Sequence, residues 1–173
     1  MAVSVANDFP VGAGLGGSSA LSAALLAAIA AWKGEPIDRS GIAEAGRALE
    51  VEELGIPGGR QDHYAATHGG ALALTFQGAT SVRRIALDAA TRDDLCSRAV
   101  LVYTGQSRIS GDTITAVLGA YKRGDATVLK ALRSMRELAE AMVDALEQGD
   151  LDRVGTLLGD HWGYQRSLHP SIP

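Results

Sequence analysis

A glycine-rich stretch near the N-terminus runs directly into a long apolar segment. Four glycines fall within the six residues 12–17, and Ser18 and Ser19 follow them. The alanine-rich segment that begins there predicts a helix over about 18–32, with the glycines and serines at its N-terminus. That end of a helix has free backbone N–H groups and the positive end of the helix dipole, and glycine lets the backbone approach a ligand closely. The stretch therefore predicts a cradle for the phosphates of a nucleotide.

Two well-known phosphate-binding loops, the lysine-bearing P-loop and the dinucleotide fingerprint, fit this stretch poorly. A lysine-bearing P-loop needs Gly-Lys followed by Ser or Thr, and the first lysine of this chain is Lys33, so that loop is excluded. The dinucleotide fingerprint G-x-G-x-x-G matches Gly12, Gly14 and Gly17. It also needs a second strand ending in an acidic residue about 20 residues further on. Residues 34–38 predict a turn there, which disfavours a dinucleotide-dependent oxidoreductase. The alternative interpretation, that the stretch is only a glycine-rich turn that caps a buried helix, stays open because serine commonly caps helices.

Composition limits the classes of protein to which the chain can belong. With 173 residues, 46% of them hydrophobic and 21% charged, it is typical of a soluble globular protein of one domain or parts of two. A net charge of −4 favours neither a nucleic-acid nor a membrane partner. The apolar helix of about 13 residues is shorter than the about 20 that cross a bilayer. Cys96 is the single cysteine, so the chain can form no internal disulfide, and this predicts a cytoplasmic location. We expect Cys96 to be a small structural hydrophobe.

Periodicity and turn residues predict a mixture of helices and strands. Strands are expected at 2–6, 71–76, 81–87 and 99–103. Helices are expected at about 18–32, from Asp38 or Ser40 to near Gly55, at about 60–67 and over most of the chain after residue 103.

Two of these helices carry further expectations. The first is apolar on every side, as a helix buried between layers should be. In the second, Ile42, Ala45 and Leu49 share one face.

A long amphipathic helix is predicted from Asp125, its cap, to Gln148. Gly149 closes this helix, and Asp150 caps the next. Its apolar stripe predicts core packing and comprises Leu129, Leu132, Met135, Ala139, Met142 and Leu146.

A second group of chemically suggestive residues follows the loop at a short distance. It comprises Glu50, Gly55, Pro57, Gly59, Asp62 and the pair Gly69-Gly70. Phosphoryl transfer depends on positioning and charge stabilisation. Mg²⁺ takes oxygen ligands, usually one or two carboxylates together with phosphates, which suits Glu50 and a Ser18 or Ser19 hydroxyl. An aspartate such as Asp62 orients or deprotonates a reacting hydroxyl. The alternatives stay open: Glu50 on a solvated helix face and Asp62 as a helix cap.

Three segments resemble the GHMP kinases, the superfamily of galactokinase, homoserine kinase and mevalonate kinase. Residues 10–20 resemble the loop P-x-x-x-G-L-G-S-S-A, with Gly17 as an extra small residue or in place of the first serine. Residues 52–66 resemble E-E-L-G-I-x-G-G-K-Q-D-Q-Y-A-A of the D-glycero-D-manno-heptose 7-phosphate kinase group, with Arg60 for lysine and His63 for the second glutamine. Residues 101–108 resemble L-V-Y-T-G-x-S-R of the same group.

The resemblance implies a fold. This is the α+β GHMP kinase fold, a ribosomal protein S5 domain 2-like ATP-binding domain followed by a ferredoxin-like C-terminal domain. Residues 1–88 are expected to form the second half of the first domain, and residues 89–173 the first half of the second. The family's first and third motifs find no match, so we expect a fragment that is incomplete at both ends. By itself it should be catalytically inactive and should form a homo-oligomer through exposed edges, with 125–148 as the foremost surface.

The resemblance also implies an activity and a set of site residues. The activity is ATP-dependent phosphorylation of the anomeric hydroxyl of a sugar, with D-glycero-D-manno-heptose 7-phosphate as the first choice of substrate. The alternatives are an unphosphorylated sugar, as for a galactokinase or fucokinase, and a non-catalytic binding module of the same fold. ATP is assigned to Gly12, Gly14, Leu15, Gly16, Gly17, Ser18 and Ser19, and Mg²⁺ to Ser18, Ser19 and Glu50. Asp62 is assigned to catalysis, and the sugar or sugar phosphate to Arg60, Gln61, Tyr64 and Arg108. For Arg60 and Arg108, an ordinary surface charge is the alternative to a phosphate clamp.

Overall fold

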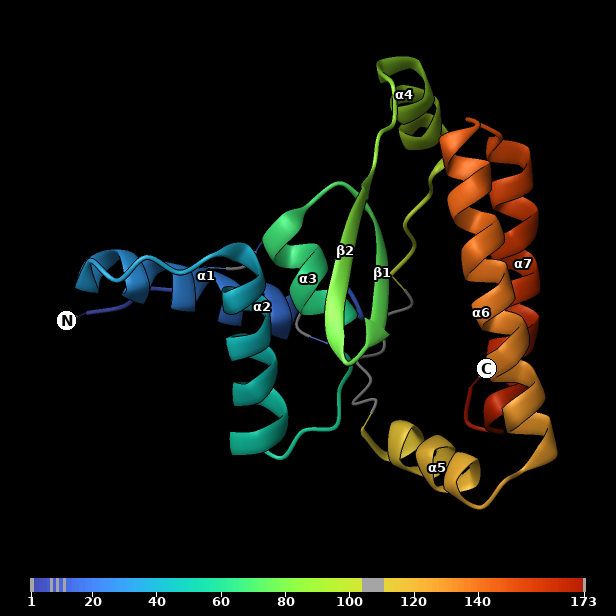
Figure 1. The fold of residues 1–173 in the computed structure, drawn as a ribbon, viewed down its shortest axis with the longest axis horizontal. Coiled ribbons are helices and arrows are strands. Elements are labelled where there is room, and N and C mark those ends of the chain that lie inside the picture. The colour runs from blue at the N-terminus through green and yellow to red at the C-terminus, as the bar shows by residue number, and fades with distance from the viewer. Residues whose placement is uncertain (1, 7, 9, 11, 104–110, 173) are drawn as a thin grey trace. The chain divides into compact units, whose positions relative to one another are not determined.

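The computed structural model describes residues 2–6, 8, 10, 12–103 and 111–172 (Figure 1). These residues form an α+β structure that is mostly helical, with one two-stranded sheet among them. They divide into two compact units. The first unit contains the described residues up to His68 together with 101–103, and the second contains 69–100 and 111–172.

The first unit is a cluster of helices that begins at the glycine-rich loop. Helix α1 (Gly17–Lys33) starts after Gly16 and ends at Gly34, and both glycines have left-handed backbone conformations that favour glycine. Helix α2 (Arg39–Ala48) starts where the Asp38 carboxylate accepts a hydrogen bond from the Gly41 N–H. Both predicted ends of α1 and the predicted start of α2 are therefore confirmed to within a residue or two, whereas α2 ends at Ala48, earlier than the predicted end near Gly55.

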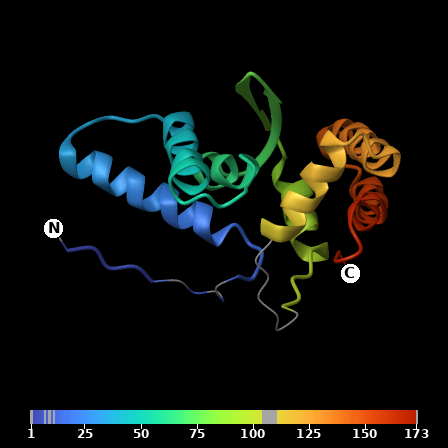
Figure 2. The same ribbon diagram turned by 90° about the horizontal axis from the view of Figure 1, so that it is seen from below.

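The chain leaves α2 through a single π-helical turn, η1 (Leu49–Glu53), which the sequence pattern does not distinguish from continued α-helix. An irregular segment leads to α3 (Gln61–His68), which confirms the short helix predicted there. Helices α1, α2 and α3 pack against one another (Figure 2). The buried residues of α1 and α2 include the small Ala23, Ala43 and Gly46, which leave room for the larger His63 and Tyr64 that α3 buries.

One expectation about these helices is wrong. Helix α1 is not buried between layers, because only Ser19 and Ala23 of this helix are buried and Trp32 is 70% exposed. The buried residues of α2 are Ala43 and Gly46, and Leu49, which was predicted to share a face with Ile42 and Ala45, lies exposed at the start of η1.

The second unit begins with a β-hairpin. Strands β1 (Ala71–Gln77) and β2 (Ala79–Ile85) are antiparallel, with Ala71 opposite Ile85 and Gln77 opposite Ala79. Gly78 turns the chain between them with a positive φ. Both predicted strands are confirmed.

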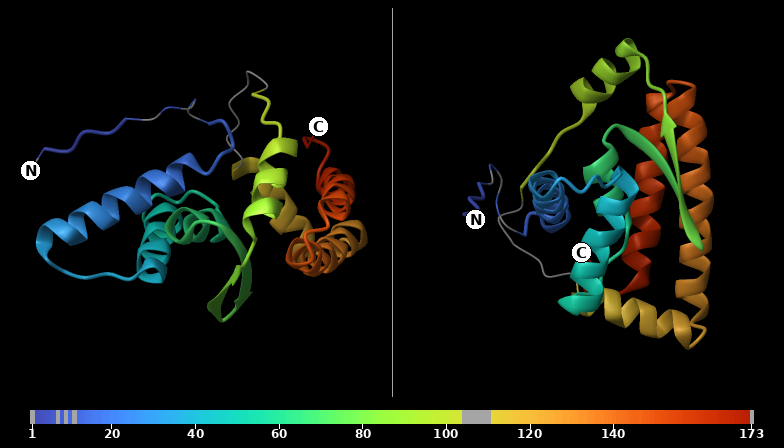
Figure 3. Two further views of the ribbon diagram at one scale, coloured as in Figure 1. Left: turned by 90° about the horizontal axis from the view of Figure 1, so that it is seen from above. Right: turned by 60° about the vertical axis from the view of Figure 1, so that its left-hand side comes forward.

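Four helices complete the second unit: α4 (Ala89–Arg98), α5 (Gly111–Lys122), α6 (Ala126–Glu147) and α7 (Leu151–Leu168). As predicted, Asp125 caps α6 and Asp150 caps α7, with Gly149 between the helices. Helices α6 and α7 run side by side (Figure 3). Their core consists of Ala145, Leu151, Val154 and Leu157.

The predicted stripe on α6 is only partly buried. Met142 and Leu146 pack against the core shared with α7, whereas Ala139 is exposed. The most buried residues of the helix are Val128, Ala131 and Ala145. A groove of about 790 Å³ lies between α6 and the hairpin, and Ala139, Met142 and Leu146 are among the residues that line it.

Two predicted strands and one predicted burial are wrong. Residues 2–6 and 99–103 belong to no strand, and Val100, Leu101 and Val102 are 83, 78 and 74% exposed. An apolar run becomes a strand only when a neighbour accepts its backbone hydrogen bonds, and the sheet of the described residues is the hairpin alone. Cys96 lies exposed on α4, so it is not a core hydrophobe.

Helix α4 has no counterpart among the predicted elements. Asp88 caps it by accepting a hydrogen bond from the Thr91 N–H. Hydrogen bonds from Thr91 hold the pKa of Asp88 below its usual value. The capping residue Asp88 is the one signal in the sequence that could have predicted α4. The segment has no apolar stripe to support that prediction, and none of its residues is buried.

Candidate functional site

The glycine-rich loop is shaped by alternating left-handed residues. Gly12, Gly14 and Gly16 have φ of +76°, +75° and +66°, which other residues rarely adopt, and Leu15 between them is exposed. The first backbone hydrogen bond of α1 runs from the Ala20 N–H to the Gly16 carbonyl at 2.9 Å. The amides of residues 17–19 therefore precede the intrahelical ladder, as the positive end of a helix dipole requires for anion binding.

The structure brings one of the two loop serines to the predicted metal-binding carboxylate. Ser18 Oγ donates a hydrogen bond of 3.0 Å to Oε1 of Glu50, 32 residues along the chain. Glu50 stands in the π-turn η1, and its backbone carbonyl accepts a hydrogen bond from the Ile56 N–H at 3.0 Å. Ser19 is buried in the helix contact. Of the two serines, Ser18 is therefore the one whose hydroxyl contacts the carboxylate of Glu50.

Asp62 lies against the same loop. It stands in the first turn of α3, and a Cβ added at Gly16 would lie 3.5 Å from the Asp62 Cβ and 3.9 Å from its Oδ1. Gly16 is thus the point where the loop and the predicted catalytic aspartate meet. Residues from α1, η1 and α3 converge on one small region within the first unit.

The residues predicted to contact the sugar occupy different environments. Tyr64 is 2% exposed, and its hydroxyl donates to Oε1 of Glu44 at 2.8 Å. The Arg60 Nε lies 3.3 Å from the other carboxylate oxygen of Glu44. Gln61 is exposed and its amide lies over Gly59. Arg108 lies outside the described residues.

His63 lies at the centre of this region, although no sequence pattern predicts a role for it. It is 2% exposed, and its Nε2 lies 3.2 Å from Oε2 of Glu50. The one signal available in the sequence was its departure from the glutamine of the motif that residues 52–66 resemble.

The arrangement suits an anionic ligand with a hard cation. Ser18 and Glu50 supply oxygen donors, which Mg²⁺ prefers, and a phosphate ligand would supply the remaining oxygens. In the described part of the chain, no three His, Cys, Asp or Glu side chains group closely enough to hold a metal by themselves. The oxygen donors of Ser18 and Glu50 are of the type that Mg²⁺ combines with phosphate oxygens.

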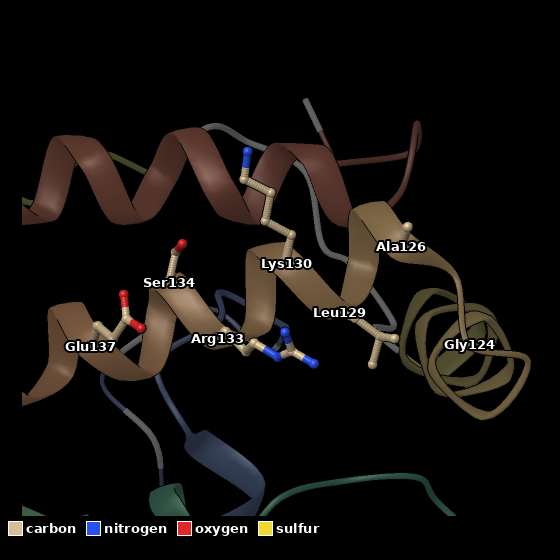
Figure 4. Close-up of a pocket in the computed structure, with 7 residues that line it drawn as sticks. All are labelled: Gly124, Ala126, Leu129, Lys130, Arg133, Ser134 and Glu137. Atoms are coloured by element: carbon tan, nitrogen blue, oxygen red, sulfur yellow. The ribbon is translucent and has the colours of Figure 1, made fainter.

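A separate hollow lies on the second unit. It is lined by residues of α6 and the turn before it: Gly124, Ala126, Leu129, Lys130, Arg133, Ser134 and Glu137. Figure 4 shows Lys130 and Arg133 pointing to different sides of the helix, so their charges do not converge on one point. None of the motif residues lines it. Among the described helices, none is long and apolar enough to span a bilayer.

Comparisons with known proteins agree with the motif residues. Residues 1–70 match the model of the GHMP kinases N terminal domain. A D-glycero-alpha-D-manno-heptose 7-phosphate kinase from Campylobacter jejuni is 34% identical over 158 residues, which are 90% of this chain and 46% of that protein. A galactokinase from Mycobacterium tuberculosis is 36% identical over 110 residues, covering 62% of this chain and 29% of the galactokinase.

A fucokinase and a solved structure extend the comparison. A bifunctional fucokinase/GDP-fucose pyrophosphorylase from Arabidopsis thaliana is 26% identical over 98% of this chain and 16% of its own length. The crystal structure of a Campylobacter jejuni protein assigned as a sugar kinase has a TM-score of 0.68 and 32% identity, covering 90% of this chain and 43% of that one.

The chain spans less than half the length of these relatives. The family match ends at residue 70, close to His68, where the first stretch of the first compact unit also ends. The family model over residues 1–70, and the similarity to sugar kinases over most of the chain, agree with the resemblance to the GHMP kinases that the motif residues carry.

Proposed function

We propose that this chain supplies the phosphate-binding and catalytic part of an ATP-dependent sugar kinase. The enzyme would transfer the γ-phosphoryl group of ATP to the anomeric hydroxyl of D-glycero-D-manno-heptose 7-phosphate. The observation that carries the proposal is the convergence of Ser18, Glu50 and Asp62 on the glycine-rich loop. The similarity to a heptose 7-phosphate kinase over 90% of the chain supports the choice of sugar.

In this proposal the loop binds the phosphates of ATP. The cradle consists of Gly12, Gly14, Leu15, Gly16, Gly17, Ser18 and Ser19, with the amides at the start of α1 facing the phosphate oxygens. Ser18 and Glu50 would hold Mg²⁺, and buried Ser19 would contribute mainly to the backbone of the cradle. Bound Mg²⁺ neutralises charge on the phosphates.

Asp62 is proposed to receive the sugar hydroxyl. Its carboxylate lies beside Gly16 at the end of the cradle, where the terminal phosphate would be presented. A carboxylate within hydrogen-bond reach of the hydroxyl orients it and accepts its proton as the bond to phosphorus forms. The same residue stands in the first turn of α3, so it also contributes favourably to the helix dipole.

The proposed sugar-binding residues are Arg60, Gln61, Tyr64 and Arg108. Of the first three, Gln61 is exposed beside Asp62. Glu44 holds Arg60 and the Tyr64 hydroxyl, so these two residues act on the sugar site chiefly by fixing α3. The guanidinium groups of Arg60 and Arg108 suit the 7-phosphate of the heptose, because a guanidinium binds phosphate through two parallel hydrogen bonds.

Two alternatives stay open, and the relatives support the first of them. Galactokinase and fucokinase relatives favour an unphosphorylated sugar. A non-catalytic binding module of the same fold would keep the loop without turnover.

For the whole protein we further propose two domains, a cytoplasmic location and association into a homo-oligomer. Residues 1–88 would belong to a ribosomal protein S5 domain 2-like ATP-binding domain, and residues 89–173 to a ferredoxin-like C-terminal domain.

The first prediction concerns the loop. Gly16→Val should weaken binding of Mg·ATP by tenfold or more, because valine at a φ of +66° distorts the cradle and crowds Asp62. Isothermal titration calorimetry measures this. Gly34→Val is the matched control, since Gly34 ends the same helix with a φ of +72° and has open space around it. Equal ATP affinity in the two variants would remove the loop from the site.

The second prediction concerns catalysis. Asp62→Asn should lower kcat by about 10²–10⁴ in the protein that carries this sequence while leaving ATP affinity nearly unchanged, because the amide fills the same space but accepts no proton. A coupled ADP-release assay measures kcat. Asp112→Asn, at the same first-turn position of α5, should behave as the unmodified protein. Full turnover by Asp62→Asn would reduce Asp62 to a helix-stabilising residue.

The third prediction concerns the substrate. D-glycero-D-manno-heptose 7-phosphate should give a kcat/KM at least about 100-fold above galactose and fucose, because a site built for a buried polar group rejects ligands that lack it. The same assay with the three sugars tests this. Preference for a free sugar would select the galactokinase-like or fucokinase-like alternative, and ATP binding without turnover on any sugar would select the binding module.

A further inference from the structure

We infer that His63 is a positioning residue that orients the carboxylate of Glu50 when Mg·ATP is bound beside Ser18. The inference rests on the proposed function, since it assigns to Glu50 a role toward Mg·ATP. It adds a residue from the interior of the helix cluster to the site.

The two oxygens of one carboxylate connect His63 to the loop. Oε1 of Glu50 accepts the hydrogen bond from Ser18 at 3.0 Å, and Oε2 lies 3.2 Å from Nε2 of His63. The side chain of Glu50 is 19% exposed and that of His63 is 2% exposed. The carboxylate therefore stands between a surface residue on α1 and a buried residue on α3.

The position of the imidazole is set by the closeness of the three helices. A Cβ at Gly46 of α2 would come within 2.9 Å of the His63 Cδ2 and equally close to Oγ of Ser22 on α1. The backbone of His63 is held as well, because Thr67 Oγ1 donates to its carbonyl at 3.0 Å. The ring has little freedom to turn away from Glu50.

The contact between His63 and Glu50 is not yet a hydrogen bond. The N···O distance is within reach, but the N–H direction is misaligned, and neither ring nitrogen has a hydrogen-bonding partner within the described part of the chain. Buried polar groups normally have partners, and hydrogen bonds at catalytic sites often align only when ligand binds. The geometry fits an imidazole that forms its hydrogen bond to Glu50 when the carboxylate turns toward a ligand.

This arrangement gives His63 a defined task. A ligand that attracts the Ser18 hydroxyl would remove the contact at Oε1, and the contact with His63 would remain to orient the carboxylate. Partners behind a metal ligand typically change metal affinity by 10–100-fold when removed. A residue that only filled the core would have no such effect on the metal-dependent part of binding.

The first test compares two substitutions of similar size. The ATP dissociation constant is measured by calorimetry with Mg²⁺ and with EDTA, and the ratio gives the affinity gained from the metal. We expect His63→Gln, which keeps an N–H donor, to retain this gain to within about threefold. His63→Leu, which has no donor, should lose about tenfold or more of it. His68→Gln, on the same helix, is the control and should retain the gain in full, because His68 stacks on Tyr64 instead of facing Glu50.

Two outcomes of this comparison overturn the inference. One is a folded His63→Leu protein with an unchanged metal gain, and the other is a His63→Gln protein that loses as much as His63→Leu. Circular dichroism and urea unfolding establish that each variant is folded. If the unmodified protein shows no ATP binding or no effect of Mg²⁺, the proposed function fails, and this result is distinct from a failure confined to the His63 variants.

The second test needs no variant, so it decides the matter even if His63→Leu does not fold. A long-range ¹H–¹⁵N correlation spectrum of the unmodified protein reports which imidazole nitrogens of His63 carry protons. The inference requires a proton on Nε2, the nitrogen that faces Glu50, and expects its resonance to shift when Mg·ATP is added. An Nε2 without a proton would overturn it, because that nitrogen could not donate to the carboxylate.

Discussion

The hydrogen bond from Ser18 to Glu50 ties together the two sequence motifs of this chain. It joins the N-terminus of α1 to the π-turn after α2, 32 residues away, and is partly open to solvent. In such a setting a single bond contributes modestly to stability, about 1.5–3 kcal/mol even with a charged acceptor. Its importance is geometric, because it sets an oxygen donor of the loop beside a carboxylate and so creates a place for a cation beside an anion cradle.

Small side chains make that contact possible. Ala23, Ala43 and Gly46 allow α1, α2 and α3 to approach closely, and the buried polar residues Ser19 and His63 lie among them. Glu44 then fixes α3 through Tyr64 and Arg60, which keeps Asp62 against Gly16. The site is thus supported by a layer of buried polar contacts and small residues in place of a large apolar core.

Local signals in the sequence predicted most of the helices and the hairpin. Capping aspartates and closing glycines act within a few residues, so Asp38, Asp125 and Gly149 marked helix ends correctly. The strands predicted at 2–6 and 99–103 did not form, because an apolar run does not reveal whether a neighbour exists to pair with it. Exposure of Cys96 and of one side of α1 likewise depends on which surfaces other elements cover.

The site was predicted in part for the same reason. Motif spacing brought Ser18, Glu50 and Asp62 to attention, and the structure places them together. Spacing did not distinguish Ser18 from Ser19, because the difference depends on which of the two adjacent side chains is buried and which contacts Glu50. It also gave no reason to choose His63, whose meaning comes from the slot at Gly46 and from the nearby carboxylate.

A double-mutant cycle on Ser18 and Glu50 tests the central claim most directly. The free energy of Mg·ATP binding is measured for the unmodified protein, Ser18→Ala, Glu50→Gln and the double variant. If the two side chains serve one bound group, their effects should be coupled by about 1 kcal/mol or more, so that the double variant binds little worse than the weaker single variant. Additive effects, or no loss of affinity in any variant, would contradict the account.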